Sequence, residues 1–180
     1  MQVGKLDFIP VLERLDLVGK PVADFLQHHD AENVYVSAID PTLADTATFC
    51  AAYGIAMDIS ANCVILEAKR AEKTWYVACM VLATDRADVN GTVRRHLDAR
   101  KISFAPMDAA VTLSAMEYGG ITPIGLPDEW PILVDNTVTQ TEWAIIGSGI
   151  RGSKLLVSGK LLASLPGATV LDLAKQISQV

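Results

Sequence analysis

The sequence lacks several features that would assign it to a common class of protein. Its three cysteines, Cys50, Cys63 and Cys79, are an odd number without a CxxC spacing, and their apolar surroundings favour buried free thiols. Aromatic residues are only 6% of the chain, so its core must be mainly aliphatic. No apolar run approaches the roughly 18 residues of a membrane span, and the N-terminus has no signal-peptide pattern. These absences predict a soluble, reduced, cytoplasmic protein.

An excess of positive charge is also missing. Fifteen lysines and arginines against 21 aspartates and glutamates give a net charge of −6. Strong non-specific nucleic-acid binding usually needs a basic surface, because neutralised phosphates supply most of the affinity. A nucleic-acid partner would therefore have to bind a local patch of basic residues. The candidate patch is also compatible with the solvated face of a helix. The candidate basic residues are Arg86, Arg94, Arg95, Arg100 and Lys101.

The chain has the composition of a folded domain, with 51% hydrophobic and 20% charged residues. Its 180 residues suit one domain with at most a short appendage. An apolar stripe at helical spacing from Leu6 to Leu17 predicts an amphipathic helix within residues 1–20, suited to docking on a partner or a second copy. A second helix is expected from Val22 to His29.

Strands and helices then mix without strict alternation. The expected strands are 33–38, 62–66, 75–82, 101–104, 132–135, 143–146 and 154–157. The expected helices are 43–53, 88–99 and 107–116, with short ones around Leu161 and Leu173. Runs 62–66 and 75–82, joined by the charged segment 67–73, predict an antiparallel hairpin. This order favours an α+β fold with a mixed sheet over a doubly wound parallel sheet.

Common catalytic motifs are incomplete. The three histidines, His28, His29 and His96, form no HxxxH pattern, which argues against a zinc site. The sequence also lacks the GxSxG motif of the α/β-type serine hydrolases. Residues 147–152 match GxGxxG, but a strand is expected after them, whereas a dinucleotide fingerprint requires a helix. The sequence therefore predicts neither a metal nor a cofactor.

Two glycine-rich loops remain, at residues 118–125 and 147–152. Consecutive N–H groups in such loops can surround a developing oxyanion, although tight turns alone would also explain the glycines. The first loop, Tyr118-Gly119-Gly120-Ile121-Thr122-Pro123-Ile124-Gly125, resembles the Gly-Gly-x-Ser/Thr-Pro-x-Gly signature of the YbaK/ProX family.

Further segments resemble this family in the same order along the chain. They are residues 84–88, the strand ending at Asp135, the loop 147–152 and the closing segment 167–174, so the resemblance covers residues 21–176. It implies one α+β domain over residues 21–180, with a mixed, mostly antiparallel, barrel-like sheet flanked by helices. Residues 1–20 would form a helical extension.

The family comprises bacterial aminoacyl-tRNA deacylases that clear mischarged tRNA in trans, related to the editing insert of bacterial prolyl-tRNA synthetases. The implied partner is the acceptor end of an aminoacyl-tRNA. An aminoacyl-tRNA synthetase and a second copy of the chain are further candidate partners. The resemblance implies that water, aided by a ribose hydroxyl of the substrate, attacks the ester without a protein nucleophile.

The resemblance also suggests roles for individual residues. The backbone amides of Gly119 and Gly120 would stabilise the oxyanion, and loop 147–151 would line the opposite wall. The expected substrate-binding residues are Tyr35, Met57, Ala61, Asn62, Ile121, Thr122, Pro123, Gly147, Ser148 and Gly149.

One departure from the family concerns a lysine. The family places it at the start of the strand after the first helix, in a Lys-Thr/Asn-Leu-Val pattern, where this chain has Ala61-Asn62-Cys63-Val64. Asn62 keeps the polar neighbour and stays a catalytic candidate. Lys69 and Arg70 lie up to ~26 Å further along an extended strand, too far to substitute. Arg151 is the candidate replacement cation, although a surface ion pair would equally explain it.

The missing lysine leaves two hypotheses open. The first is a deacylase with an atypical active site, in which pocket size selects a small mischarged side chain. The second is a non-catalytic module that binds an aminoacyl or nucleotide ligand, or a partner protein.

Overall fold

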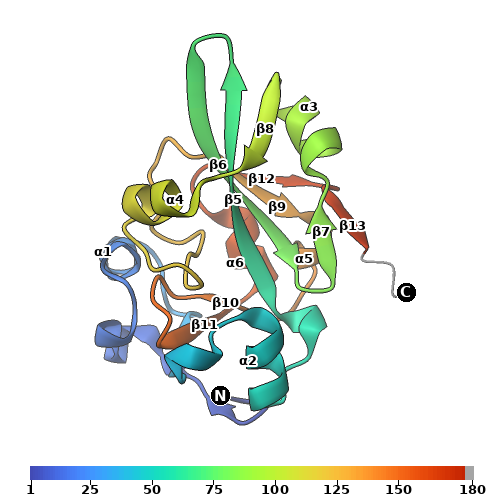
Figure 1. Ribbon diagram of the computed structural model, residues 1–180. Helices are drawn as coiled ribbons and strands as arrows, with labels where there is room; N and C mark the ends of the chain where they lie inside the picture. The colour runs from blue at the N-terminus through green and yellow to red at the C-terminus, as the bar shows by residue number, and fades with distance from the viewer. Residues whose placement is uncertain (177–180) are drawn as a thin grey trace.

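Two sheets form the framework of the protein, whose computed structural model describes residues 1–176 (Figure 1). The larger sheet has the strand order β12–β9–β6–β5–β8, antiparallel except for the β12–β9 and β9–β6 pairs. Its strands are β5 (Ala61–Arg70), β6 (Lys73–Leu82), β8 (Lys101–Phe104), β9 (Ile132–Asp135) and β12 (Ala168–Leu171).

The second sheet is antiparallel, with the order β10–β11–β4–β3. Its strands are β3 (Ile9–Pro10), β4 (Tyr35–Ala38), β10 (Ala144–Gly147) and β11 (Ser153–Val157). Two small ribbons pair β1 (Gln2–Val3) with β2 (Leu6–Asp7), and β7 (Asp85–Ala87) with β13 (Ala174–Gln176). The α+β class is confirmed, but the sheets do not close into a barrel: an isolated bridge between Ser60 and Ile145 joins the two large sheets.

Short helices cover these sheets. They are α1 (Lys20–His28), α2 (Thr46–Tyr53), α3 (Arg94–His96), α4 (Met107–Ser114), α5 (Asn136–Thr139) and α6 (Gly159–Ser164). A π-helical turn over Val89–Val93 precedes α3, and 3₁₀ turns occupy Val11–Glu13, Leu15–Leu17, Pro41–Leu43 and Met57–Ile59. No helix within residues 1–176 is both long enough and apolar enough to cross a membrane.

The predicted N-terminal helix over Leu6–Leu17 is wrong. This segment forms strands β2 and β3 and two 3₁₀ turns. Leu6 and Phe8 are buried on either side of the exposed Asp7, which is the two-residue alternation of a strand, and Pro10 pairs with Tyr35 of β4. The spacing of the apolar residues in this segment is therefore compatible with both a helix and a strand. Pairing with β4 selects the strand.

Two further corrections concern strands. The charged segment 67–73 is mostly hairpin strand rather than connection, and the turn between β5 and β6 is only residues 71–72. Charged residues suit these positions because the tip of the hairpin projects from the body of the molecule (Figure 1). Around Leu173 the chain forms β12 and β13 instead of a helix, since β12 completes the large sheet beside β9.

The predicted helix over 88–99 is also shorter than expected. Only Arg94–His96 is α-helical, after the π-helical turn. The Asp88 carboxylate accepts a hydrogen bond from the Thr92 backbone N–H at 3.0 Å, which closes this wide first turn. Gly91, whose helix propensity is low, lies inside the same turn.

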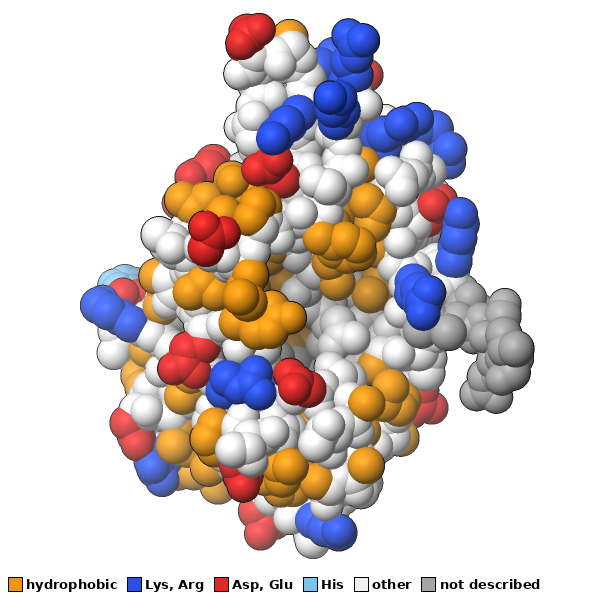
Figure 2. Space-filling view, viewed as in Figure 1, with side chains coloured by type: hydrophobic (Ala, Val, Ile, Leu, Met, Phe, Trp, Pro, Cys, Tyr) orange, Lys and Arg blue, Asp and Glu red, His pale blue; other side chains and the backbone are white. Residues whose placement is uncertain are grey.

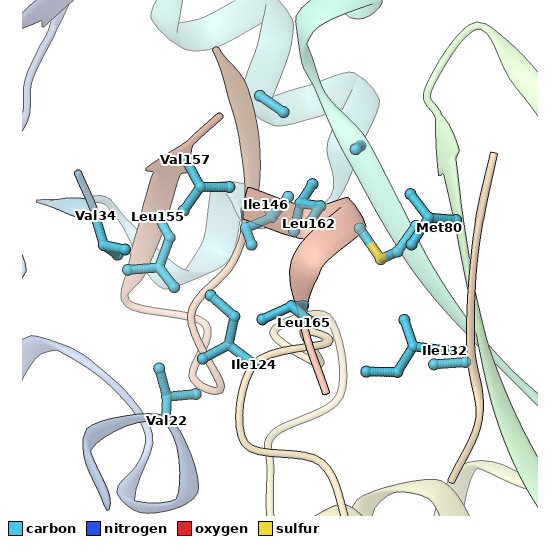
Figure 3. Close-up of a cluster of buried hydrophobic side chains, with 14 of the residues drawn as sticks. Val22, Val34, Met80, Ile124, Ile132, Ile146, Leu155, Val157, Leu162 and Leu165 are labelled. Carbon is cyan, nitrogen blue, oxygen red and sulfur yellow. The ribbon is translucent and has the colours of Figure 1, made fainter. Parts of the chain in front are cut away.

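The main hydrophobic core lies between the two large sheets and holds the first glycine loop in place (Figure 3). Ile124 of that loop is fully buried, and Figure 3 shows it among Leu155, Ile146 and Leu165. Full burial of one such side chain contributes about 1.5–3 kcal/mol. The first glycine loop is therefore anchored in the core by one of its own side chains, that of Ile124.

Candidate functional site

A cavity of about 440 Å³ opens where β5, β10 and the first glycine loop meet. Its wall comes from residues within 60–65, 104–110, 118–121 and 145–147, completed by Thr46 and Lys154. Figure 2 shows the hollow near the middle of this face, with hydrophobic side chains along its rim. A mainly apolar concavity with a few polar groups is typical of a small-molecule site.

The two glycine loops lie directly against each other rather than on opposite walls of the cavity, and of residues 147–151 only Gly147 lines it. The Gly149 N–H donates to the Gly120 carbonyl oxygen at 2.7 Å, and the Glu117 N–H donates to the Gly149 carbonyl oxygen at 2.9 Å. A Cβ on Gly147 would lie 2.5 Å from the Gly120 oxygen and 2.7 Å from the Ile121 oxygen. Only glycine allows this close approach of β10 to the first loop.

The backbone amides of the first loop differ from the expectation in one respect. The Gly120 N–H donates to the Glu117 carbonyl oxygen at 2.9 Å, so a tight turn already uses it. The amides of Gly119 and Ile121 have no protein acceptor within residues 1–176, and both residues line the cavity. Tyr118, which also lines the cavity, has an unpaired amide too within this described part of the chain, and Gly119 and Ile121 are the unpaired amides that flank Gly120 in the glycine signature.

Arg151 contacts the first loop but does not line the cavity. Its Nε donates to the Pro41 carbonyl oxygen at 3.1 Å, and its Nη1 donates to the Tyr118 carbonyl oxygen at 3.2 Å. Nη1 also lies 3.5 Å from the Asp45 carboxylate. The predicted replacement cation is thus a positioning residue, which ties the Tyr118–Gly119 peptide to the segment before α2.

Asn62 and Ala61, two of the predicted site residues, line the cavity at the start of β5. The Thr46 hydroxyl donates to Asn62 Oδ1 at 2.7 Å, which leaves the Asn62 NH₂ group as a donor for a ligand. Ala61, where the resemblance places the family lysine, presents only a methyl group. The sequence comparison pointed to this gap, but it did not find the amine that the cavity does contain.

That amine belongs to Lys154 of β11. Its side chain is buried, and its Nζ donates to the Ala44 carbonyl oxygen at 3.0 Å and lies 5.1 Å from the centre of the Phe49 ring. Burial lowers the pKa of this amine. The sequence does contain a signal for this residue, because a lysine stands in the strand segment Ser153–Val157 among apolar side chains. Burying a charge in such a strand is costly, so a lysine there points to a function.

Cys63 also lines the cavity but has the wrong charge state for a nucleophile. Burial, reinforced by neighbouring Cys79, raises the pKa of its thiol well above its usual range. The thiol therefore stays protonated near neutral pH. Within the described residues 1–176, no three His, Cys, Asp or Glu residues gather to hold a metal ion.

The remaining expected residues lie outside the cavity wall. Tyr35 packs edge-on against Trp143, and Met57 is an exposed residue of a 3₁₀ turn. Pro123 contributes to a different groove, beside Trp130. These three residues do not share a surface with the two free amides.

Thr122, Ser148 and Gly149 lie beneath the wall and are buried. The Ser148 hydroxyl donates to the Ser153 carbonyl oxygen at 3.0 Å and accepts from the Ser153 hydroxyl at 2.6 Å. These contacts brace the second loop against β11. The resemblance gave these three as substrate-binding residues, whereas in the structure they do not line the cavity.

The contact at Gly147 yields a stability prediction. Gly147→Ala should displace the first loop, because its Cβ meets backbone oxygens that cannot rotate away. We expect the free energy of unfolding to fall by about 1–3 kcal/mol, as in overpacked cores. Hydrogen exchange of the amides in residues 118–121 should become faster.

Gly152→Ala is the matched control, because its new Cβ would meet only Ile150 Cδ1, at 3.9 Å. Equal unfolding free energies and equal exchange rates in the two variants would show that the loops do not depend on this contact.

Comparison with known proteins gives a consistent identification. Residues 40–165 match the aminoacyl-tRNA editing domain family. A candidate trans-editing enzyme for prolyl-tRNA synthetase has a similar structure, with a TM-score of 0.74 and 17% identity over 87% of this chain and 96% of that one. Hypothetical protein APE2540 gives a TM-score of 0.76 and 18% identity over 87% and 100% of the two chains. These structures share the fold, and the family match spans well over half of the sequence. The chain belongs to the aminoacyl-tRNA editing domain family, as its resemblance to YbaK/ProX proteins predicted.

Proposed function

We propose that this protein hydrolyses the ester of mischarged aminoacyl-tRNA in trans. The observation that carries the proposal is the pair of unpaired amides, Gly119 and Ile121, at the wall of a cavity in an aminoacyl-tRNA editing domain. Backbone N–H groups fixed in this way suit the oxygen of an ester carbonyl, where negative charge develops during hydrolysis.

In the proposed reaction, the aminoacylated end of the tRNA enters the cavity and its carbonyl oxygen accepts hydrogen bonds from Gly119 and Ile121. Water adds to the carbonyl carbon, aided by the neighbouring ribose hydroxyl as in the related deacylases. The electron pair moves onto the carbonyl oxygen and returns as the bond to the ribose oxygen breaks. That oxygen takes up the proton lost by water, releasing the amino acid and free tRNA. Each amide donor is worth about 3–4 kcal/mol at the transition state.

The surroundings of the cavity favour water as the attacking group. The Cys63 thiol is held protonated, and the Asn62 NH₂ group can orient a polar part of the substrate but cannot attack it. The side walls include Val64, Ile65 and Ala110, which are apolar. Such walls suit a small apolar aminoacyl group, with its size as the basis of selection.

A basic groove gives the acceptor stem a place to bind. We define it by the residues that carry its charge, Lys69, Arg94, Arg100 and Lys101; Glu67 also lines it and pairs with Lys69 at 2.6 Å. Arg94, Arg100 and Lys101 form no ion pair within residues 1–176. Basic side chains gather at this end of the molecule in Figure 2. Arg86 and Arg95, expected in the same patch, do not line the groove.

Strand β8 links the basic groove to the cavity. Lys101 at its start lines the groove, and Phe104 at its end lines the cavity, about 10 Å further along an extended strand. Phe104 and Tyr118 are 69% and 60% exposed at the cavity mouth. Exposed aromatic rings of this kind stack on unpaired bases, as the single-stranded end of a tRNA provides.

The groove predicts a salt-dependent effect on binding. Arg94→Gln together with Lys101→Gln should weaken tRNA binding and lower the slope of log affinity against log salt by about 1 for each phosphate that is no longer neutralised. Fluorescence anisotropy with labelled tRNA at several salt concentrations measures both quantities.

Lys5→Gln is the control, since it removes one exposed charge near the N-terminus, at the opposite end of the molecule in Figure 1. If the double variant and Lys5→Gln had the same slope as the wild type, the groove would not bind the phosphate backbone.

The activity itself is tested with purified protein and a panel of mischarged aminoacyl-tRNAs. We expect release of the amino acid from at least one small-residue mischarged tRNA above the uncatalysed rate. Ile121→Pro, which removes one amide donor, should lower kcat by about 10²–10³-fold. Ile121→Val keeps the amide and should retain most of the activity, and thermal unfolding confirms that both variants are folded.

The second candidate function is a non-catalytic binding module, and Ala61 is the observation that favours it. Binding of aminoacyl-tRNA without cleavage of any member of the panel would support the module and contradict the deacylase.

A further inference from the structure

Lys154 lines the cavity, yet the proposed hydrolysis gives its amine no part. The residue is only 7% exposed. An ammonium group has three N–H donors, and the bond to the Ala44 carbonyl oxygen uses one of them. Within residues 1–176 its Nζ forms no ion pair, and the neighbouring Asp45 carboxylate faces Arg151 instead. Two donors are therefore left for a ligand.

A buried ammonium with this set of partners is costly for the folded protein. Burial removes its hydration, and one neutral carbonyl oxygen with the face of Phe49 restores only part of the lost interaction. An apolar side chain of similar length would avoid this cost. Incompletely paired charges in cavities are typical of functional sites, where the missing partner is supplied by the substrate.

The register of the second sheet places the Lys154 side chain on the side of the first glycine loop, and Lys154, Gly119 and Ile121 line the same cavity. Lys154 of β11 lies directly opposite Gly147 of β10. Side chains of directly opposed residues leave an antiparallel pair on the same face. On Gly147 that direction leads to the Gly120 and Ile121 carbonyl oxygens. Lys154 therefore leaves the sheet on the face that carries the first glycine loop.

We infer that Lys154 is a catalytic residue, whose ammonium group donates a hydrogen bond to the ester carbonyl oxygen as negative charge develops there. This inference rests on the proposed deacylation. The bonds made and broken are those already described: water adds, the ribose oxygen leaves, and no bond forms to Nζ. The ammonium keeps its proton and acts through its charge, supplying from β11 the cation that Ala61 does not supply from β5.

The electrostatic surroundings set the pH range of this role. Burial lowers the pKa of Lys154; the neighbouring Cys50 and Asp45 oppose that shift, and Arg151 adds to it. The active ammonium form exists below this pKa. The catalysed rate should therefore fall as pH rises through it, at a pH below that of an exposed lysine.

Lys154→Met tests the role, because it keeps the length of the side chain and removes the charge. With the tRNA that the wild type cleaves, we expect kcat to fall by about 10²–10³-fold with little change in KM. The free energy of unfolding should be unchanged or higher, since a buried unpaired charge has been removed. Lys154→Arg should recover part of kcat and lose the alkaline fall in rate, because a guanidinium stays charged. Lys160→Met, at an exposed lysine of α6, is the matched control.

Three results would overturn the inference. They are a wild-type kcat in Lys154→Met, a loss of kcat accompanied by a matching loss of stability, and an unchanged alkaline limb in Lys154→Arg. Failure of the proposed function looks different, because the wild-type protein itself would then cleave no aminoacyl-tRNA.

Discussion

The site depends on the backbone contact between two glycine loops. Gly147 lets strand β10 approach the Gly120 and Ile121 carbonyl oxygens, and the Gly149 N–H then binds the Gly120 oxygen at 2.7 Å. These contacts fix the Gly120–Ile121 peptide, which carries the Ile121 amide, and Arg151 holds the Tyr118–Gly119 peptide, which carries the Gly119 amide. Ile124 anchors the same loop from below in the core, and Arg151 ties it to the segment before α2. The donors are thus held in place before any ligand arrives, which is the condition for strong electrostatic stabilisation of a transition state.

The charges around this cavity have separate tasks. Arg151 uses its guanidinium on backbone carbonyl oxygens and so shapes the loop, whereas Lys154 lines the cavity and has one of its three donors bound to the Ala44 oxygen. The basic groove lies outside the cavity, at the far end of β8, and can attract phosphates although the whole chain carries a charge of −6. In the function that we propose, one surface binds the tRNA backbone while a smaller enclosed region acts on the ester.

Sequence reasoning worked best where local chemistry decides the structure. The β5–β6 hairpin, helix α1 and the two glycine loops follow from apolar runs and from a signature that requires close backbone packing. It failed at Leu6–Leu17, because the spacing of apolar residues there fits both a helix and a strand and only pairing with β4 selects the strand. It also assigned Gly120 as a free donor, although the turn from Glu117 uses that amide.

Lys154 shows why part of the site could not be predicted from the sequence. Its position on the side of the first glycine loop follows from the pairing of Lys154 with Gly147 and from the packing of Gly147 on that loop. Both are contacts between segments that are separate in the sequence. The register in which two strands pair cannot be read from one sequence alone. The sequence showed a lysine inside an apolar strand, but it did not show which face of the sheet the lysine side chain leaves. Arg151 was chosen instead because it lies in a recognisable loop.

The most direct measurement is the structure of the protein bound to an adenosine that carries its amino acid through a non-hydrolysable amide. The carbonyl oxygen of that amide should lie within hydrogen-bonding distance, about 2.7–3.1 Å, of the Gly119 and Ile121 nitrogens, with the Lys154 amine on the same oxygen. A carbonyl oxygen directed into solvent, or an aminoacyl group bound outside the cavity, would contradict the arrangement described for this site.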